Sequence, residues 1–489
     1  MSYISPADRN QYTMMNSLDD LLASEHPVRL LDQVIDLIVS NNPERFGEEK
    51  IGEVGRPQYS PGTLLKLYLY GYCNGIRSSR KLEMESRRNI EVMWLLGTLS
   101  PDHWTISTYR KDHGEDIKYM TKKFREFLHD TGYIKGECVA IDGSKIKANA
   151  KRDTLTKEKI EKRLERVDED LEKYLGLLAE NDQREDLSEE LDTMEDISDR
   201  EATLVNKIVA LQQQVEALTK QKGQLKESGQ THINSTDPEA HLMKSREGII
   251  PAYNVQIVVD AENKLIADSE VLTNPDDHNL LPMMVASLVE EIGKEPEEVL
   301  ADKGYYTPDL VEKVEKEHGC MCYVPYPEKK NNSLKEITFQ YNHFTDSYIC
   351  SEGKPLPLLL KNKHKHKSRA DVYRGTHCLE CRLRQACTTS RYGRQLYRYN
   401  NEIWRERYKE RLRQPLNQIK LAMRKYIVEH PFGTIKWLGG KIPLLLRGLK
   451  NATTEINLYT TAYNLKRLFN IESFQTLRDI FSTYQWRTP

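Results

Sequence analysis

The sequence has no run of about 18 uninterrupted apolar residues, which excludes an evident transmembrane helix. Its first residues lack a basic segment followed by an apolar one, so a secretory signal peptide is not expected. We therefore expect a cytoplasmic protein without a membrane partner. The 489 residues are too many for one ordinary core, and about two to four structural units are expected.

An excess of charge of one sign is also missing, since the formal net charge is −2. The charged residues are nevertheless unevenly distributed along the chain. Residues 151–228 carry 14 Lys and Arg against 21 Asp and Glu, a local charge of −7, so the rest of the chain carries +5. Residues 380–470 are visibly basic. Because phosphate binding depends on local clusters of charge, the mean does not exclude a nucleic-acid partner, although such surfaces are often only solvated.

Eight cysteines in a chain expected in the cytoplasm argue against a disulfide framework. Four of them lie within one turn-rich segment, at Cys350, Cys378, Cys381 and Cys387. Four thiolates are the right number for a closed tetrahedral Zn²⁺ site, although the 28-residue step after the first cysteine is longer than usual. Free thiols and an iron–sulfur cluster are the alternatives. We expect the nearby His364 and His366 in a solvated basic loop, which zinc would hold against DNA.

The N-terminal segment, residues 1–125, is predicted to be helical. Apolar residues recur at three- and four-residue steps from Ser17 onward, and Ser100-Pro101-Asp102 is typical of a helix start. Short helices with basic side chains suit a DNA-binding domain, and a plain helical bundle with a charged surface is the alternative. The candidate DNA contacts in this segment are Arg77, Arg80, Lys81 and Arg110.

Strand patterns indicate an α/β core. A β-rich run ends in Asp-Gly within residues 136–150, and residues 246–330 follow the order ββαβαβ. Helices resume over residues 396–475. We predict a mixed sheet flanked by helices, with insertions at residues 151–245 and 331–395.

The first insertion contains two near-heptad apolar runs within residues 155–228, separated by the acidic stretch NDQREDLSEELDTMEDISD. The simplest structure is a coiled-coil helical hairpin folded back on itself. A coiled coil formed between two chains is the alternative.

Three acidic residues occur at the ends of predicted elements. Asp142 and Asp302 each end a strand, and Glu429 lies towards the end of a basic helix. DNA hydrolysis and transesterification use two divalent cations about 4 Å apart, and carboxylates at adjacent strand ends could hold them. Each aspartate taken singly is more often an ordinary turn residue or cap.

The ordered combination resembles the DDE transposases of bacterial insertion sequences. The similar segments run along almost the whole chain: GRPQYSPGTLLKLYLYGYCNGIRSSRKL, AIDGSKIKANA, TNPDDHNLLPMM, ADKGYY, VEHPFGTIKW and RGLKNATTEINLYTTAYNLKRL. The resemblance implies an all-α N-terminal domain and a ribonuclease-H-like catalytic core.

In that family the three acids hold the catalytic metal pair, which implies this role for Asp142, Asp302 and Glu429, with two Mg²⁺ or Mn²⁺ ions. The last family helix carries a Tyr, an Arg, the Glu and a Lys at fixed spacing. Here Glu429 and Lys436 match, whereas Ala422 and Lys425 depart from it. Lys425 keeps a positive charge without the bidentate geometry of Arg. Both lysines are candidate contacts to the DNA backbone.

The resemblance therefore implies a nucleoid-associated enzyme that cuts double-stranded DNA at the ends of its own element and joins the 3′ hydroxyls to target DNA. A homodimer or larger assembly on DNA is expected. A nuclease without strand transfer and a non-catalytic DNA-binding descendant are the alternatives.

Overall fold

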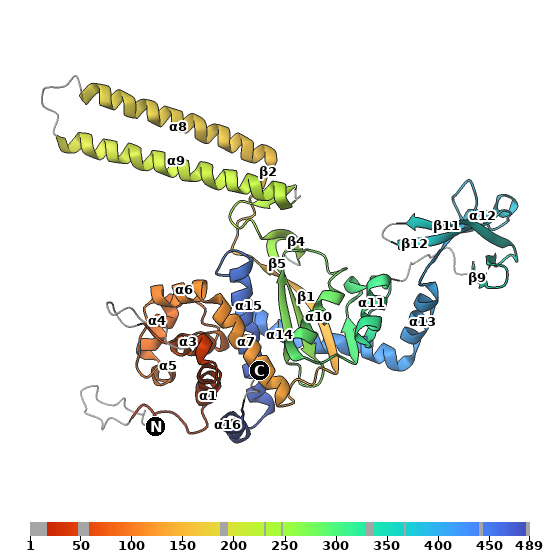
Figure 1. Ribbon diagram of the computed structural model, residues 1–489, viewed down its shortest axis with the longest axis horizontal. Helices are drawn as coiled ribbons and strands as arrows, with labels where there is room; N and C mark the ends of the chain where they lie inside the picture. Colours follow the sequence, from red (N-terminus) through yellow and green to blue (C-terminus); the bar gives the residue numbers. More distant parts are fainter. Residues whose placement is uncertain are drawn as a thin grey trace, which may run out of the picture.

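The protein, seen here as a computed structural model, is a mixed α/β structure with many helices (Figure 1). The structure describes residues 17–46, 58–185, 194–228, 231–245, 248–327, 337–365, 368–439 and 444–485. Within these ranges, none of the helices is both long and apolar enough to span a lipid bilayer.

The N-terminal part is helical, as expected. Its helices are α1 (Pro27–Ser40), α2 (Pro43–Phe46), α3 (Pro61–Cys73), α4 (Ser79–Arg88), α5 (Ile90–Leu95), α6 (His103–Asp112) and α7 (Gly114–Asp130). Asp102 caps α6 by accepting a hydrogen bond from the Thr105 amide at 2.7 Å, so the predicted helix start there is confirmed. The first helix begins later than predicted, because His26 is its N-cap and Pro27 suits only a first helical turn.

The main sheet has six strands: β1 (Cys138–Lys147), β4 (His241–Ser245), β5 (Gly248–Asp260), β6 (Ile266–Leu272), β7 (Glu298–Ala301) and β8 (Met321–Tyr323). The strand order is β4-β5-β1-β7-β8, and β6 pairs with β5. β1 is antiparallel to β5 and parallel to β7, which is in turn parallel to β8. Helices α10 (Leu281–Ile292) and α11 (Pro308–His318) supply the two connections between β6, β7 and β8, and the short η1 (Lys303–Tyr305) follows β7. The predicted mixed sheet is confirmed.

Helix α15 joins the helical part to the sheet. The C-terminal helices are α13 (Glu402–Arg413), α14 (Pro415–Gly439), α15 (Leu449–Ile471) and α16 (Phe474–Thr483). The apolar residues of segment 457–469 predict an amphipathic helix with one exposed face, and this is wrong, because the side chains of α15 are buried on nearly all sides. The helix contacts α3 and α7 on one side and β6 on another, so one hydrophobic core runs through both parts.

The first insertion forms a long two-helix projection (Figure 1). Helices α8 (Lys157–Glu185) and α9 (Met194–Ser228) lie side by side, and the short strands β2 (Thr154–Thr156) and β3 (His232–Asn234) pair at their base. The apolar residues buried between the helices and at this base are Leu155, Ile160, Val167, Leu218, Leu225 and Ile233. The middle of the acidic connector, residues 186–193, lies outside the described residues.

The second insertion is a separate small sheet rather than only a basic loop. Its elements are β9 (Phe339–Asn342), β10 (Ser347–Cys350), β11 (Pro355–Lys365), β12 (Ser368–Arg374), η2 (Cys378–Glu380), α12 (Arg384–Cys387) and β13 (Gln395–Tyr399). The order β13-β12-β11-β10-β9 is antiparallel throughout. In Figure 1 this sheet lies beyond α13, away from the α8–α9 projection.

Candidate functional site

Asp142 and Asp302 occupy adjacent positions of the main sheet. The last residues of β1 and β7 that pair with each other are Ile141 and Ala301, and the next residues are Asp142 and Asp302. β7 ends there as predicted, but β1 continues to Lys147 in its pairing with β5, so the predicted strand end at Asp142 is wrong. Parallel strands in register carry such residues to the same edge of the sheet. The structure therefore brings these two candidate residues together.

A guanidinium group bridges the two carboxylates. Arg424, on α14, places Nη1 3.5 Å from Asp142 Oδ2 and Nη2 3.7 Å from Asp302 Oδ1. Burial raises the pKa of the Asp142 carboxyl, and the positive charge of Arg424 opposes that effect. The guanidinium group of Arg424 thus places a positive charge between two carboxylates that would otherwise repel each other. The sequence alone does not single out Arg424, because the family pattern has its basic residue at the next position, Lys425.

The third acid, Glu429, is not beside the other two. Its side chain is 62% exposed and its carboxylate lies 3.6 Å from Lys425 on the same helix. Helix α14 presents Arg424, Ile427 and Val428 to the core, and a residue five positions after Arg424 lies about 140° further around the helix. The three carboxylates that the resemblance places together are therefore not gathered in this arrangement, and a shared metal site remains a prediction. The direction of the Glu429 side chain is decided by the helical phase of α14 and not by the spacing along the sequence.

The two aspartates provide part of a metal site. The two adjacent aspartates provide the hard oxygen ligands that Mg²⁺ prefers, and the bridging guanidinium shows that a cation is stabilised between them. In the described part of the chain, however, no group of three or more His, Cys, Asp and Glu side chains is gathered closely enough to hold a metal ion. The pair fits a cation, and the predicted trio is not assembled.

A network of polar side chains from β1, β5 and the loop that carries Asp277 lies near Asp142. Asp277 Oδ1 accepts hydrogen bonds from Lys145 Nζ at 3.0 Å, Asn254 Nδ2 at 2.8 Å and Gln256 Nε2 at 3.0 Å. The Asn254 and Gln256 side chains are fully buried on β5. Tyr305 donates its hydroxyl to Gln256, and burial raises the pKa of this phenol so that it stays protonated. The negative charge of Asp277 also reaches Asp142, so this loop acid belongs to the site.

Gly143 is required where β1 passes this network. A Cβ at this position would collide with the amide nitrogen of Gln256 and lie 3.2 Å from Asn254 Oδ1. The Gly143 amide also donates to Asp142 Oδ1 at 2.9 Å. The Asp-Gly pair of the sequence therefore combines a carboxylate with the only residue that fits beside it.

Two of the predicted DNA contacts are structural residues. Arg77 is 7% exposed and lies 3.4 Å from the fully buried Glu455 on α15. Arg110 is 4% exposed and donates to the Arg77 carbonyl at 3.0 Å. Their assignment to DNA is wrong, because both guanidinium groups are used inside the core to neutralise a buried carboxylate. Glu455 is far from both arginines along the chain, so local sequence patterns do not indicate this contact.

The other predicted DNA contacts are exposed. Arg80 and Lys81 lie on the surface of α4. Lys436 is exposed on α14, with Nζ 5.6 Å from the centre of the Phe432 ring, and Lys425 is held by its ion pair on the same helix. These side chains are accessible to a phosphate backbone, but they do not form one cluster with the aspartates.

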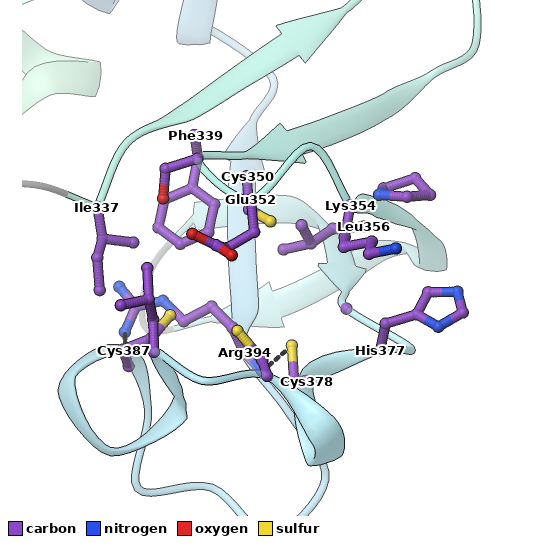
Figure 2. Close-up of a pocket in the computed structure, with 15 residues that line it drawn as sticks. Ile337, Phe339, Cys350, Glu352, Lys354, Leu356, His377, Cys378, Cys387 and Arg394 are labelled. Atoms are coloured by element: carbon purple, nitrogen blue, oxygen red, sulfur yellow. Dashed lines mark hydrogen bonds between the residues drawn. The ribbon is translucent and has the colours of Figure 1, made fainter.

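The four clustered cysteines line a single pocket of the small sheet (Figure 2). Cys350 ends β10, Cys378 starts η2, Cys381 follows it and Cys387 ends α12. The structure therefore brings together all four thiols that the sequence grouped. Of the two histidines considered with them, His364 is exposed on β11, and His366 lies outside the described residues.

The fold and the paired aspartates define an α/β protein with an acidic site at the edge of a mixed sheet. Two family models match the chain: "Transposase domain (DUF772)" over residues 16–112 and "Transposase DDE domain" over residues 349–469. These matches confirm the resemblance to the DDE transposases. The second match contains Glu429 and the four cysteines, whereas Asp142 and Asp302 lie between the two matched segments.

Among solved structures, the cryo-EM structure of the piggyBac transposase synaptic complex with hairpin DNA is similar at 9% identity and a TM-score of 0.26. The similarity covers 95% of this chain and 86% of that chain. A score this low does not define the fold. None of the curated proteins matches the sequence significantly.

Proposed function

We propose that the protein is a DNA transposase that binds the ends of its own insertion sequence, cuts there and joins the exposed 3′ hydroxyls to target DNA. The observation that carries the proposal is the Asp142–Asp302 pair on adjacent strands, in a chain that matches a transposase DDE domain. The mixed sheet, with β1 between an antiparallel and a parallel neighbour, supports the ribonuclease-H-like core that the resemblance implies.

The proposed cofactor is a pair of Mg²⁺ or Mn²⁺ ions at Asp142 and Asp302. Such ions would activate the attacking oxygen and stabilise the leaving oxygen. The chain itself fixes the two carboxylates one strand apart, and the buried Asn254 and Gln256 hold Asp277 near them. Arg424 provides a second cation directed at the same place, suited to a phosphate once the carboxylates have other partners.

For Glu429 to complete the site, α14 must change its orientation. Glu429 lies about 140° around the helix axis from Arg424, so a local change of α14 next to Pro431 would have to bring Glu429 towards the aspartates while Arg424 stays beside them. We place this change in the complex with DNA and metal. Two features support it: the ion pair holding Glu429 is exposed, and Pro431 inside α14 removes a backbone hydrogen bond next to it.

The proposed partner is double-stranded DNA, contacted by Arg80, Lys81, Lys425 and Lys436 from exposed helix surfaces. The α8–α9 hairpin has an excess of acidic residues and is therefore a poor DNA surface. We assign it, as an intramolecular coiled coil, to contacts with a second subunit in a homodimer or larger assembly on DNA.

A joining assay with wild-type protein tests the proposal. Labelled DNA carrying the element ends is incubated with a target plasmid and Mg²⁺, and covalent end–target products are the expected result. Cut ends without joined products would identify a nuclease instead. Binding without either product would identify a non-catalytic DNA-binding protein.

Exchanging Glu429→Gln tests the third acid separately, with Glu410→Gln as the matched control, because Glu410 is also exposed on a helix of the same region. Loss of joining in the first variant alone would support the reorientation of α14. Full activity of Glu429→Gln would remove Glu429 from the site.

A further inference from the structure

The cysteine pocket draws its thiols from two separate segments of the small sheet. Cys350 precedes the β11–β12 hairpin, and Cys378, Cys381 and Cys387 follow it. All four border one pocket, and all are free thiols. A ligand bound to the four sulfurs would therefore close the base of the hairpin across the sheet.

The small sheet has too little hydrophobic core to be stable without such a closure. Across the described residues between 337 and 399, the buried hydrophobic side chains are Leu356, Ala370, Val372 and Tyr373. None of them belongs to the continuous core of the rest of the protein. Units of this size with a small core are usually held by disulfides or by a structural metal ion.

The backbone around Cys378 is arranged as a thiolate site requires. The Arg394 amide donates a hydrogen bond to Cys378 Sγ at 3.4 Å, which favours the charged form of sulfur. Gly393 has a φ of +92°, and a Cβ there would lie 3.1 Å from Cys378 Cβ. Gly375 faces the same sulfur, and a Cβ there would be only 2.5 Å from it. Two glycines thus let the chain wrap tightly around one sulfur.

An ion pair joins the two thiol-bearing segments. The Arg382 guanidinium donates to both carboxylate oxygens of Glu352, at 3.0 and 3.1 Å. Glu352 lies two residues after Cys350, and Arg382 lies one residue after Cys381. The pair keeps the segments in register, and it engages the one carboxylate that lines the pocket.

Other potential ligands are directed elsewhere. His377 lines the pocket, but in Figure 2 its ring points away from the sulfurs. The remaining lining includes the apolar side chains Ile337, Phe339, Leu356 and Leu383. Among the described residues, the donor set is therefore the four sulfurs, with apolar side chains and the basic Lys354 and Arg394 around them.

We propose that Cys350, Cys378, Cys381 and Cys387 bind one structural Zn²⁺ ion, which holds the small sheet together. Four thiolates favour a closed tetrahedral site, with Zn–S distances of about 2.3 Å. The thiols border the pocket without yet being gathered to ligand distance within the described residues, so zinc draws them together on binding. The charge left on the four-thiolate site is balanced by the basic side chains around it, Arg394 among them. This inference goes beyond the proposed function and does not depend on it.

The test is metal analysis of the reduced full-length chain, together with the spectrum of its Co²⁺-substituted form. We expect about one zinc per chain and the strong visible bands of tetrahedral cobalt–thiolate. The C350S variant and the C378S/C381S double variant should each lose them. The matched control is C73S, because Cys73 lies on α3, away from the pocket, and this variant should keep both signals.

Three results would overturn the proposal: no zinc and no cobalt–thiolate bands in the wild-type chain, iron in place of zinc, or full zinc and unchanged bands in C350S. If the variants do not fold, limited proteolysis of the wild-type chain with and without a chelator gives the answer. New cleavage within residues 337–399 on chelation is expected, and an unchanged pattern would contradict a structural role.

Discussion

Replacing Glu455 with Ala tests whether the N-terminal helices are held to the rest of the protein by a buried charge cluster. The Glu455 side chain is fully buried, lies 3.4 Å from Arg77 and accepts a hydrogen bond from the Leu445 amide at 2.8 Å. Burial raises the pKa of this carboxyl, and the positive charges of Arg110 and Arg77 oppose the rise. Removing the Glu455 carboxylate leaves the buried guanidinium groups of Arg77 and Arg110 without the acid that neutralises them.

Breaking a buried pair by removing one partner costs about 3–5 kcal/mol of folding stability. For a unit of this size the melting temperature should fall by on the order of 10 °C. The assay is thermal unfolding followed by circular dichroism. The matched control is Glu115→Ala, which removes an exposed carboxylate 3.9 Å from Lys450 and should change little. Equal melting temperatures for both variants would refute the buried network, and would return Arg77 and Arg110 to the candidates for DNA contact.

Three further predictions concern other parts of the structure. Gly143→Ala should abolish joining activity and reduce stability, because the new methyl group collides with the Gln256 amide; a normal melting temperature and full activity would contradict the close packing. Burial raises the pKa of Asp268 to about 6, so the folded protein binds the proton of this carboxyl more tightly than the unfolded chain does. The contribution of Asp268 to folding stability is therefore greatest below about pH 4 and is lost as the pH rises to about 6. The difference in melting temperature between wild type and Asp268→Asn should therefore vary with pH across this window, and a constant difference would contradict the shift. Replacing residues 157–228 with a short Gly/Ser linker should leave the core folded, because β2 and β3 still meet at the base, and should weaken assembly on DNA ends in sedimentation experiments; loss of the folded core would show that the hairpin belongs to it.

Local patterns in the sequence were sufficient where neighbouring residues decide the structure. Short β-rich apolar runs predicted β1, which carries Asp142, and β7, which ends just before Asp302, and the heptad-like runs predicted two helices that pack on each other. The cysteine spacing predicted a cluster, and the four thiols border one pocket. In each case the prediction depends on residues close together in the sequence or on the residue types themselves.

The sequence could not show contacts that depend on distant partners. Arg77 and Glu455 are separated by 378 residues, so nothing near the arginine indicates that it is buried. The orientation of α14 has the same cause: its apolar pattern permits more than one phase, and packing on the sheet turns Arg424 inward and Glu429 outward. Asp277 enters the site from a loop, where no periodic pattern exists to reveal its direction.

In the proposed function, Asp142 and Asp302 form the catalytic pair of a transposase. Its most direct test is the joining of precut element ends to target DNA by the variants Asp142→Asn and Asp302→Asn. Each should lose Mg²⁺-dependent joining by at least about a thousandfold while binding the ends normally, because an amide cannot replace a metal-binding carboxylate. The control Asp276→Asn, an exposed residue of the neighbouring loop, should join as well as wild type. Joining by either aspartate variant at the wild-type rate would contradict the account.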